Sequence, residues 1–290
     1  MNSLKYPSLS ALLMAVIYLP VCEAVTLVDY VAKHPIKLFI ATKGSVMPNE
    51  TDQSNNLQEG DRALLLSDKG LTDIRGISRL MVEDDGKVVP VTSVANLHVF
   101  LNVNQIDTMP AEIAKLENMV FLYCEFNRMS ALPKVMGKMK NLVGMYFTSN
   151  EFKEIPPFIY QMTWLKKLQF SKNRLTSLPP EIGNLTEIRH FNMSGNEITT
   201  IPDSMANLAL LRVCDLSDNQ ITELPEVFGK VQIVNQLRVR NNPLTSLPLG
   251  FATMRATIDI TGTNIDFDKL PPELQVKIST EKPPGSKEPD

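Results

Sequence analysis

An asparagine and a proline recur along this chain at a constant step of 23 residues. The asparagines are Asn104, Asn127, Asn150, Asn173, Asn196, Asn219 and Asn242, and the prolines are Pro110, Pro133, Pro156, Pro179, Pro202, Pro225 and Pro248. Two residue types that keep one period over seven units make coincidence negligible. A fixed period of about 20 to 50 residues is typical of stacked structural repeats, so we expect a solenoid.

Each unit begins with the pattern of a half-buried strand, as in "LQFSKNRLTSLP". Leu168 and Phe170 alternate with the polar residues Gln169 and Ser171, and further leucines follow the asparagine. One strand from each unit is predicted to stack into a parallel sheet, with the later apolar residues packed behind it. No unit can bury its apolar face alone, so the stack is the stable object.

The asparagine and the proline are predicted to be structural. Asn173 stands where the chain leaves its strand, and its amide can both donate to and accept from backbone groups of the turn. Stacked asparagines would form a ladder that satisfies backbone groups otherwise buried without partners. Loss of one such residue is predicted to cost roughly 1–3 kcal/mol. Pro179 stiffens the outer connection, where no N–H is needed.

This unit, apolar-x-apolar-x-x-Asn-x-apolar-x-x-apolar-Pro, resembles the leucine-rich repeat in its 23-residue form. The ending "LPxxIGxL" is similar to the repeats of the Ras-group leucine-rich-repeat proteins. The resemblance covers roughly Leu97 to Pro271. It implies an α/β repeat solenoid, curved like a horseshoe, with a parallel sheet on the concave side and irregular or short helical segments on the convex side. The same repeat serves many unrelated partners, so it specifies the fold and not the function.

The N-terminal residues 1–24 have the layout of a signal peptide: one lysine, the apolar run Leu9–Val21, and small residues at Cys22 and Ala24 for cleavage after Ala24. The run is short for a membrane span, and an uncleaved anchor or a buried N-terminal helix are the alternatives. Beyond it we expect an N-terminal cap, repeats, a C-terminal cap and a disordered polar tail. Their predicted bounds are 25–96, 97–265, 266–278 and 279–290.

The predicted N-terminal cap contains one degenerate repeat at about 61–80, with Lys69 in the asparagine position. An insert follows, for which we expect a small hairpin around Asp85-Gly86. Before the degenerate repeat, "TLVDYVAKH" favours a helix and "IKLFIA" an edge strand.

The composition excludes several classes of function. A net charge of -3 and a pI of about 5.7 give no basis for a nucleic-acid partner or an anionic membrane surface. Once the predicted signal is removed, Cys124 and Cys214 remain, at buried strand positions where they act as small apolar residues too far apart to pair. An exported chain without disulfides favours a bacterial protein over a eukaryotic ectodomain.

Motifs for catalysis or cofactor binding are missing from the sequence. His34, His98 and His190 are too distant to form a local metal motif, and there is no phosphate-binding glycine loop. We expect His98 and His190 to be surface histidines. The sequence therefore predicts no enzyme, no metal and no cofactor.

Alternate strand residues define the predicted concave face, which is the candidate partner-binding surface. These candidates are Phe100, Phe121, Tyr123, Glu125, Phe126, Tyr146, Lys167, Gln169, His190, Asn192, Asp215, Arg238 and Arg240. The aromatic residues among them gather on the first three strands, as a water-facing binding patch or as a surface covered by the insert or the N-terminal cap. The acidic and basic residues near the other end could steer a charged partner or pair with each other.

The favoured function is non-enzymatic recognition of a protein partner on the concave face. The predicted signal places a monomeric protein outside the cytoplasm, as a secreted, periplasmic or cell-surface molecule. Membrane contact is expected only if the signal segment is not cleaved. The alternative is an intracellular regulatory scaffold resembling the Ras-group proteins, which requires residues 1–24 to stay on the chain.

Overall fold

The computed structural model describes residues 25–34, 36–40, 58, 60–231, 233 and 235–278 of the 290-residue chain. The predicted signal peptide and the predicted disordered tail both lie outside the described residues. Among the described helices, none has the length and apolar character needed to cross a membrane.

One sheet of 10 strands runs along the molecule in the order β14-β13-β12-β11-β10-β9-β8-β7-β3-β2. Every neighbouring pair is parallel except β2 with β3, which is antiparallel. The strands are β2 (Phe39–Ile40), β3 (Arg62–Leu65), β7 (Leu97–Phe100), β8 (Met119–Tyr123), β9 (Gly144–Tyr146), β10 (Lys167–Gln169), β11 (His190–Asn192), β12 (Val213–Asp215), β13 (Gln236–Arg238) and β14 (Thr257–Asp259). Each repeat contributes one strand, as the period predicts.

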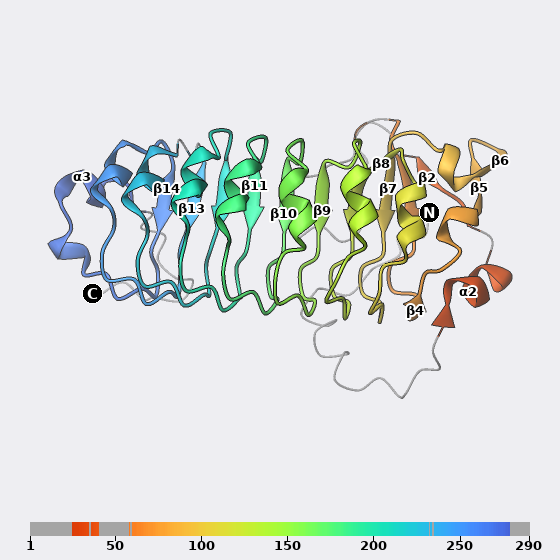
Figure 1. The fold of residues 1–290 in the computed structure, drawn as a ribbon, viewed down its shortest axis with the longest axis horizontal. Helices are drawn as coiled ribbons and strands as arrows, with labels where there is room; N and C mark the ends of the chain where they lie inside the picture. Colours follow the sequence, from red (N-terminus) through yellow and green to blue (C-terminus); the bar gives the residue numbers. More distant parts are fainter. Residues whose placement is uncertain are drawn as a thin grey trace, which may run out of the picture.

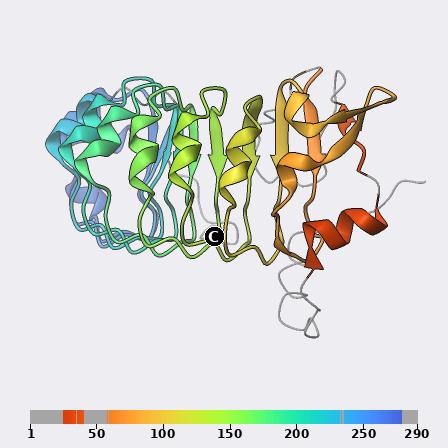
Figure 2. The same cartoon turned by 45° about the vertical axis from the view of Figure 1, so that its right-hand side comes forward.

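Short 3₁₀ helices form the second layer, opposite the sheet (Figure 1, Figure 2). Each follows the recurrent proline, whose fixed φ suits the residue before a helical turn. They are η3 (Ala111–Lys115), η4 (Lys134–Lys138), η5 (Pro157–Gln161), η6 (Pro180–Asn184), η7 (Asp203–Asn207), η8 (Glu226–Lys230) and η9 (Leu249–Thr253). A parallel sheet backed by short helical segments is the predicted fold class, which is confirmed.

The recurrent asparagines join each repeat to the one before it. Asn173 Oδ1 accepts a hydrogen bond from the Phe152 N–H at 3.0 Å, and its Nδ2 donates to the Phe147 carbonyl at 2.8 Å. The same Nδ2 donates to the Phe170 carbonyl of its own repeat at 3.0 Å. Equivalent bonds recur at the other asparagines of the series, from Asn104 to Asn242. Backbone groups that turn inward are therefore satisfied by a continuous ladder.

The core lies between the two layers and is continuous along the solenoid. Leu168 and Phe170 enter it from the strand, and Leu175 and Ile182 from the opposite layer; all four are fully buried. Cys124 and Cys214 lie in the same core as free thiols, as expected. Burial raises the pKa of both thiols well above its usual value, which leaves them protonated apolar filler.

The N-terminal end carries the expected helix and hairpin. Helix α2 (Leu27–Lys33) is capped by the Thr26 hydroxyl, and β1 (Val25–Thr26) pairs in parallel with β4 (Leu71–Asp73). Strands β5 (Met81–Asp84) and β6 (Lys87–Pro90) form the insert's antiparallel hairpin, flanked by η1 (Ile77–Arg79) and η2 (Val91–Ser93). Figure 1 places this hairpin at the end of the solenoid, beyond β7, so the insert does not cover β8 and β9.

The C-terminal end is closed by η10 (Phe267–Lys269) and by α3 (Pro272–Gln275), both within the predicted C-terminal cap. Beyond α3, the Lys277 carbonyl accepts from the Ile258 N–H at 2.7 Å, and Lys277 Nζ donates to the Met254 carbonyl at 2.7 Å. The bond from Ile258 occupies part of the edge of β14, the last strand of the sheet.

Candidate recognition surface

Two rows of residues cross strands β7, β8 and β9 on the sheet face. The register aligns Phe100 with Tyr123 and Tyr146 in one row, and His98 with Phe121 and Gly144 in the next. Within the first row the rings of Phe100 and Tyr123 stack at 4.2 Å with an angle of 5°, and those of Tyr123 and Tyr146 at 4.7 Å with 18°. We call Phe100, Phe121, Tyr123 and Tyr146 the aromatic cluster.

Gly144 leaves the space that one ring of the cluster occupies. A Cβ at this position would overlap the Phe121 ring, which extends over Gly144 toward the Tyr146 ring, with centroids 6.4 Å apart. The missing side chain on β9 therefore lets the second row pack against the first. The cluster is a closely fitted arrangement, because one residue is small where its neighbour is large.

The predicted water-facing position is wrong for three of these rings. Phe100, Phe121 and Tyr146 are only 9%, 8% and 4% exposed. Parallel strands lie roughly 4.8 Å apart, close enough for flat rings to cover each other's faces. Tyr123 is half-buried, and Phe126, at the end of β8, is 37% exposed. The cluster therefore presents exposed edges around a buried centre.

The prediction that His98 is a surface residue is also wrong, because only 1% of it is exposed. The degenerate repeat places β3 beside β7, and Asp61 Oδ2 lies 3.1 Å from His98 Nε2. The ring also stacks on Phe121 at 4.9 Å. Burial lowers the pKa of His98 to about 4, against the opposing attraction of Asp61, so the imidazole is neutral at pH 7.

Glu125 follows β8 and is half-buried, and the other candidates lie along or just after β10 to β13 and form a polar surface. Lys167 aligns with His190 and Gln169 with Asn192, and all four are half-buried. Asn192 Oδ1 accepts from the Ser194 N–H at 3.0 Å, which fixes the amide at the strand end.

The acidic and basic candidates pair with each other across neighbouring strands. Arg238 lies 3.4 Å from Asp215, and Arg240 bonds to the buried carboxylate of Asp259. Of the two alternatives for these charged residues, steering a partner or forming ion pairs within the protein, the structure shows the ion pairs.

Residues 163–221 match the family model described as Leucine rich repeat. The fold of the molecule is that of a leucine-rich-repeat solenoid. No curated protein matches the chain. Among solved structures, a leucine-rich-repeat protein of Leptospira interrogans shares 26% identity at a TM-score of 0.52, over 73% of this chain and 62% of that one.

Two further structures resemble this solenoid in fold alone. An internalin from Listeria monocytogenes is 19% identical with a TM-score of 0.54, over 70% of this chain and 61% of that one. The ectodomain of an Arabidopsis thaliana receptor kinase, GASSHO1/SCHENGEN3, solved in complex with Casparian strip integrity factor 2, is 22% identical with a TM-score of 0.53. It matches over 73% of this chain and 25% of the receptor chain, so this chain spans only part of the length of either structure.

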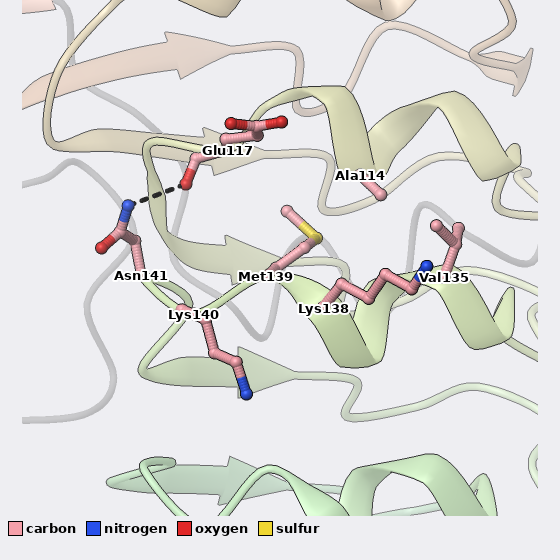
Figure 3. A pocket seen from close by; sticks show the side chains of 7 residues that line it. All are labelled: Ala114, Glu117, Val135, Lys138, Met139, Lys140 and Asn141. Carbon is pink, nitrogen blue, oxygen red and sulfur yellow. Dashed lines mark hydrogen bonds between the residues drawn. The ribbon is translucent and has the colours of Figure 1, made fainter.

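The solenoid also has a hollow on its helical side, between η3 and η4 and the turns that follow them (Figure 3). It has a volume of about 310 Å³. Its lining is Ala114, Glu117, Val135, Lys138, Met139, Lys140 and Asn141. The Asn141 amide donates to the Glu117 carbonyl at 3.0 Å, and the Lys140 ammonium sits 3.7 Å from the centre of the Trp164 ring. These contacts hold neighbouring repeats together, and the lining offers no serine, cysteine or histidine as a nucleophile or base.

A metal site is not apparent either. Within the part of the chain that the structure describes, no three His, Cys, Asp or Glu side chains lie close enough to hold an ion. The chemistry of the sheet face is thus apolar and aromatic at one end and hydrogen-bonding at the other.

Sequence reasoning missed one member of this surface, Leu65. It pairs with Phe100 in register, extends the first aromatic row onto β3, and is 38% exposed. The signal was present in "LLLSDKGL", because Leu65 occupies the same position before Lys69 as Phe100 occupies before Asn104.

Proposed function

We propose that this protein is a non-enzymatic recognition module that binds a protein partner on the sheet face of its solenoid. The observation that carries the proposal is the aromatic cluster on β7 to β9. Apart from Val213, the sheet-facing positions of β10 to β13 hold polar or charged residues, whereas these three repeats hold stacked rings. Aromatic residues at a surface are frequent anchors of protein interfaces.

Preorganisation supports the same proposal. Binding normally costs free energy because mobile side chains must be ordered. Here Tyr123 is held between Phe100 and Tyr146 by ring stacking on both sides. A partner that covers its remaining exposed surface would gain apolar contact without ordering the ring.

We expect a partner to make its first contact at the exposed boundary of the cluster. Leu65 and Phe126, 38% and 37% exposed, lie at its edge on β3 and after β8. Large apolar side chains left in water on a rigid sheet are typical of an interaction surface. We place the partner over these two residues and Tyr123, with the polar strands beside them as the rim of the interface.

A cross-linking pull-down with the full chain tests the proposal. Tyr123→Ala and Tyr146→Ala are expected to reduce capture of the native partner about tenfold or more, as for a central interface residue. Gln236→Ala on β13 is the matched control and should leave capture unchanged. Each variant is first checked by thermal unfolding, followed through the fluorescence of Trp164. If both tyrosine variants are folded and capture every partner as the unmodified chain does, the aromatic cluster is not the binding site.

We further propose that recognition occurs outside the cytoplasm with the protein as a monomer. The signal-like layout of residues 1–24 in the sequence supports the location. N-terminal sequencing of the native protein decides the point. A start at Val25 supports export, whereas a start at Met1 supports the intracellular scaffold.

A further inference from the structure

We infer that one rim of the sheet binds an extended polypeptide segment that is basic at one end, acidic at the other and apolar between. The inference rests on the proposed function, because it assumes that the partner is a protein. The rim strip consists of the residue that directly precedes the asparagine position in five neighbouring repeats. Each lies three residues beyond the end of its strand, and together they are Asp68, Val103, Phe126, Ser149 and Lys172, after β3, β7, β8, β9 and β10.

All members of the rim strip share one backbone geometry. Their φ angles are 55°, 58°, 56°, 56° and 52°, in the left-handed region. Equivalent backbone positions in a solenoid project their side chains in the same direction. With neighbouring strands roughly 4.8 Å apart, the strip forms a line of about 19 Å across the sheet.

Two members of the strip are unsuited to this geometry. A left-handed φ suits glycine, asparagine and aspartate, and it is unfavourable for aromatic and β-branched residues. Later repeats place tolerant residues here, namely Gly195, Asp218 and Asn241. Val103 and Phe126 instead hold strained conformations, yet Val103 is only half-buried and Phe126 is 37% exposed. Because burial does not offset this backbone strain, we infer that these two side chains contact a binding partner.

Charges bracket this apolar pair. Asp68 and Lys172 are both exposed, and neither makes an ion pair with any other residue that the structure describes. The charged side chains on the sheet face behave differently, since Asp215 and Arg238 pair with each other. Asp68 is therefore available to a partner's cation, and Lys172 to a partner's carboxylate. This order of charges defines the chemistry of the bound segment.

The length of the strip defines the length of the segment. An extended chain rises roughly 3.3 Å per residue, so about six residues separate the two charges. In a heptapeptide, the third and fifth side chains then fall on either side of the Phe126 ring. One lies toward Val103, and the other lies over Ser149, whose small side chain leaves room for it.

The test uses three fluorescein-labelled heptapeptides with blocked ends and leucine at the third and fifth positions, separated by serines. One carries lysine and glutamate at its ends, one two lysines and one two glutamates. Fluorescence polarisation measures each against the full chain. We expect the mixed peptide to bind roughly threefold more tightly than either other peptide, the size of an exposed ion pair. Asp68→Lys should transfer the preference to the peptide with two glutamates, and Lys172→Glu to the peptide with two lysines.

Matched controls carry the same charge changes on the helical side. Asp203→Lys on η7 and Lys115→Glu on η3 alter the net charge equally, and both residues are exposed. They should leave the preference for the mixed peptide in place. Phe126→Asn should lower the affinity for all three peptides about tenfold. It should also raise the thermal midpoint, because asparagine tolerates the left-handed backbone.

The inference is overturned if no peptide binds, if Phe126→Asn leaves affinity unchanged, or if the controls shift the preference as Asp68→Lys and Lys172→Glu do. The proposed function can hold while this inference fails. If capture of the native partner depends on Tyr123 but is indifferent to Asp68→Lys and Phe126→Asn, the sheet face is the binding site and the rim strip is not.

Discussion

The repeats of β7 to β9 and those of β10 to β13 share one backbone plan and differ in what they place on it. We call them the aromatic half and the polar half. Both use the asparagine ladder with nearly identical hydrogen-bond lengths, as Asn150 and Asn196 show. On the sheet face, however, one half holds stacked rings and the other holds hydrogen-bonding side chains and paired charges.

The two halves also differ in the residues that fill their buried cores. In the repeat that begins at Asn127, buried methionines stand where the repeat at Asn173 has branched aliphatic residues. The pairs of equivalent positions are Met129 with Leu175, Met136 with Ile182, and Met139 with Leu185. Methionine is unbranched and flexible, so it fills irregular space and adapts to movement. The comparison teaches that the ladder maintains the fold in both halves, while the aromatic half combines a fitted surface with a more adaptable core.

The largest predicted difference between the halves is sensitivity to acid. Because the pKa of His98 is lowered to about 4, the folded state binds fewer protons than the unfolded state between that value and the ordinary value of about 6.5. Stability that is present above pH 6.5 is therefore lost as the pH falls toward 4. At pH 4.5 the loss is about 2–3 kcal/mol. Urea unfolding at pH 7.5 and 4.5, followed by Trp164 fluorescence, measures it.

His98→Phe keeps a ring beside Phe121 and removes the titrating group. The difference in stability between the two pH values should shrink by that amount. His190→Gln, on β11 in the polar half, is the control and should keep the full difference. An acid loss that is the same in His98→Phe and the unmodified chain would show that His98 does not titrate in this way.

The ladder should behave alike in both halves. Asn150→Ala and Asn196→Ala each leave backbone groups without their partners, and each is expected to cost roughly 1–3 kcal/mol of unfolding free energy. Chemical denaturation of the two variants gives the values directly. Similar costs would support a fold maintained by the ladder. A much smaller cost for Asn150→Ala would mean that the methionine-rich core relaxes around the lost bonds.

The fold could be predicted because the residues that specify it recur in every repeat. Asparagine and proline positions recur, and each satisfies or restrains the backbone within one or two repeats. The burial of the site was not predictable in the same way. His98 is buried by Asp61, which comes from the degenerate repeat 37 residues earlier. Glu112, which accepts from the Ser78 hydroxyl at 3.0 Å, likewise joins the cap to the first full repeat through a contact that no period encodes.

The fit between neighbouring side chains could not be predicted from the sequence either. The sequence places Phe121 and Gly144 at the same position of consecutive repeats, but nothing in the repeat pattern shows that the ring of one fills the space left by the other. Repeat patterns predict which way a residue faces. They do not predict how far its neighbours cover it, because that depends on the residues that vary.

Gly144→Ala tests this fit. The added methyl group overlaps the Phe121 ring, so the ring must move, and we expect a loss of about 1–2 kcal/mol. The double variant with Phe121→Ala removes the overlap. In the double-mutant cycle the methyl group should then cost less than it does beside the native ring, as measured by denaturant unfolding. Equal costs in both backgrounds would mean that the Phe121 ring does not depend on the missing side chain.

The smallest expected effect concerns the core beneath the aromatic half. Met129→Leu and Met136→Ile copy the residues of the polar half, and volume-conserving exchanges of this kind usually change stability by less than about 1.5 kcal/mol. Their effect should be on local motion, since stiffer side chains restrict how the packed layers shift. Hydrogen exchange at the amides of β8 and β9 should slow in the double variant, with β12 as the internal reference. If the polar half responds as strongly as the aromatic half, the methionines fill space without giving that half a distinct adaptability.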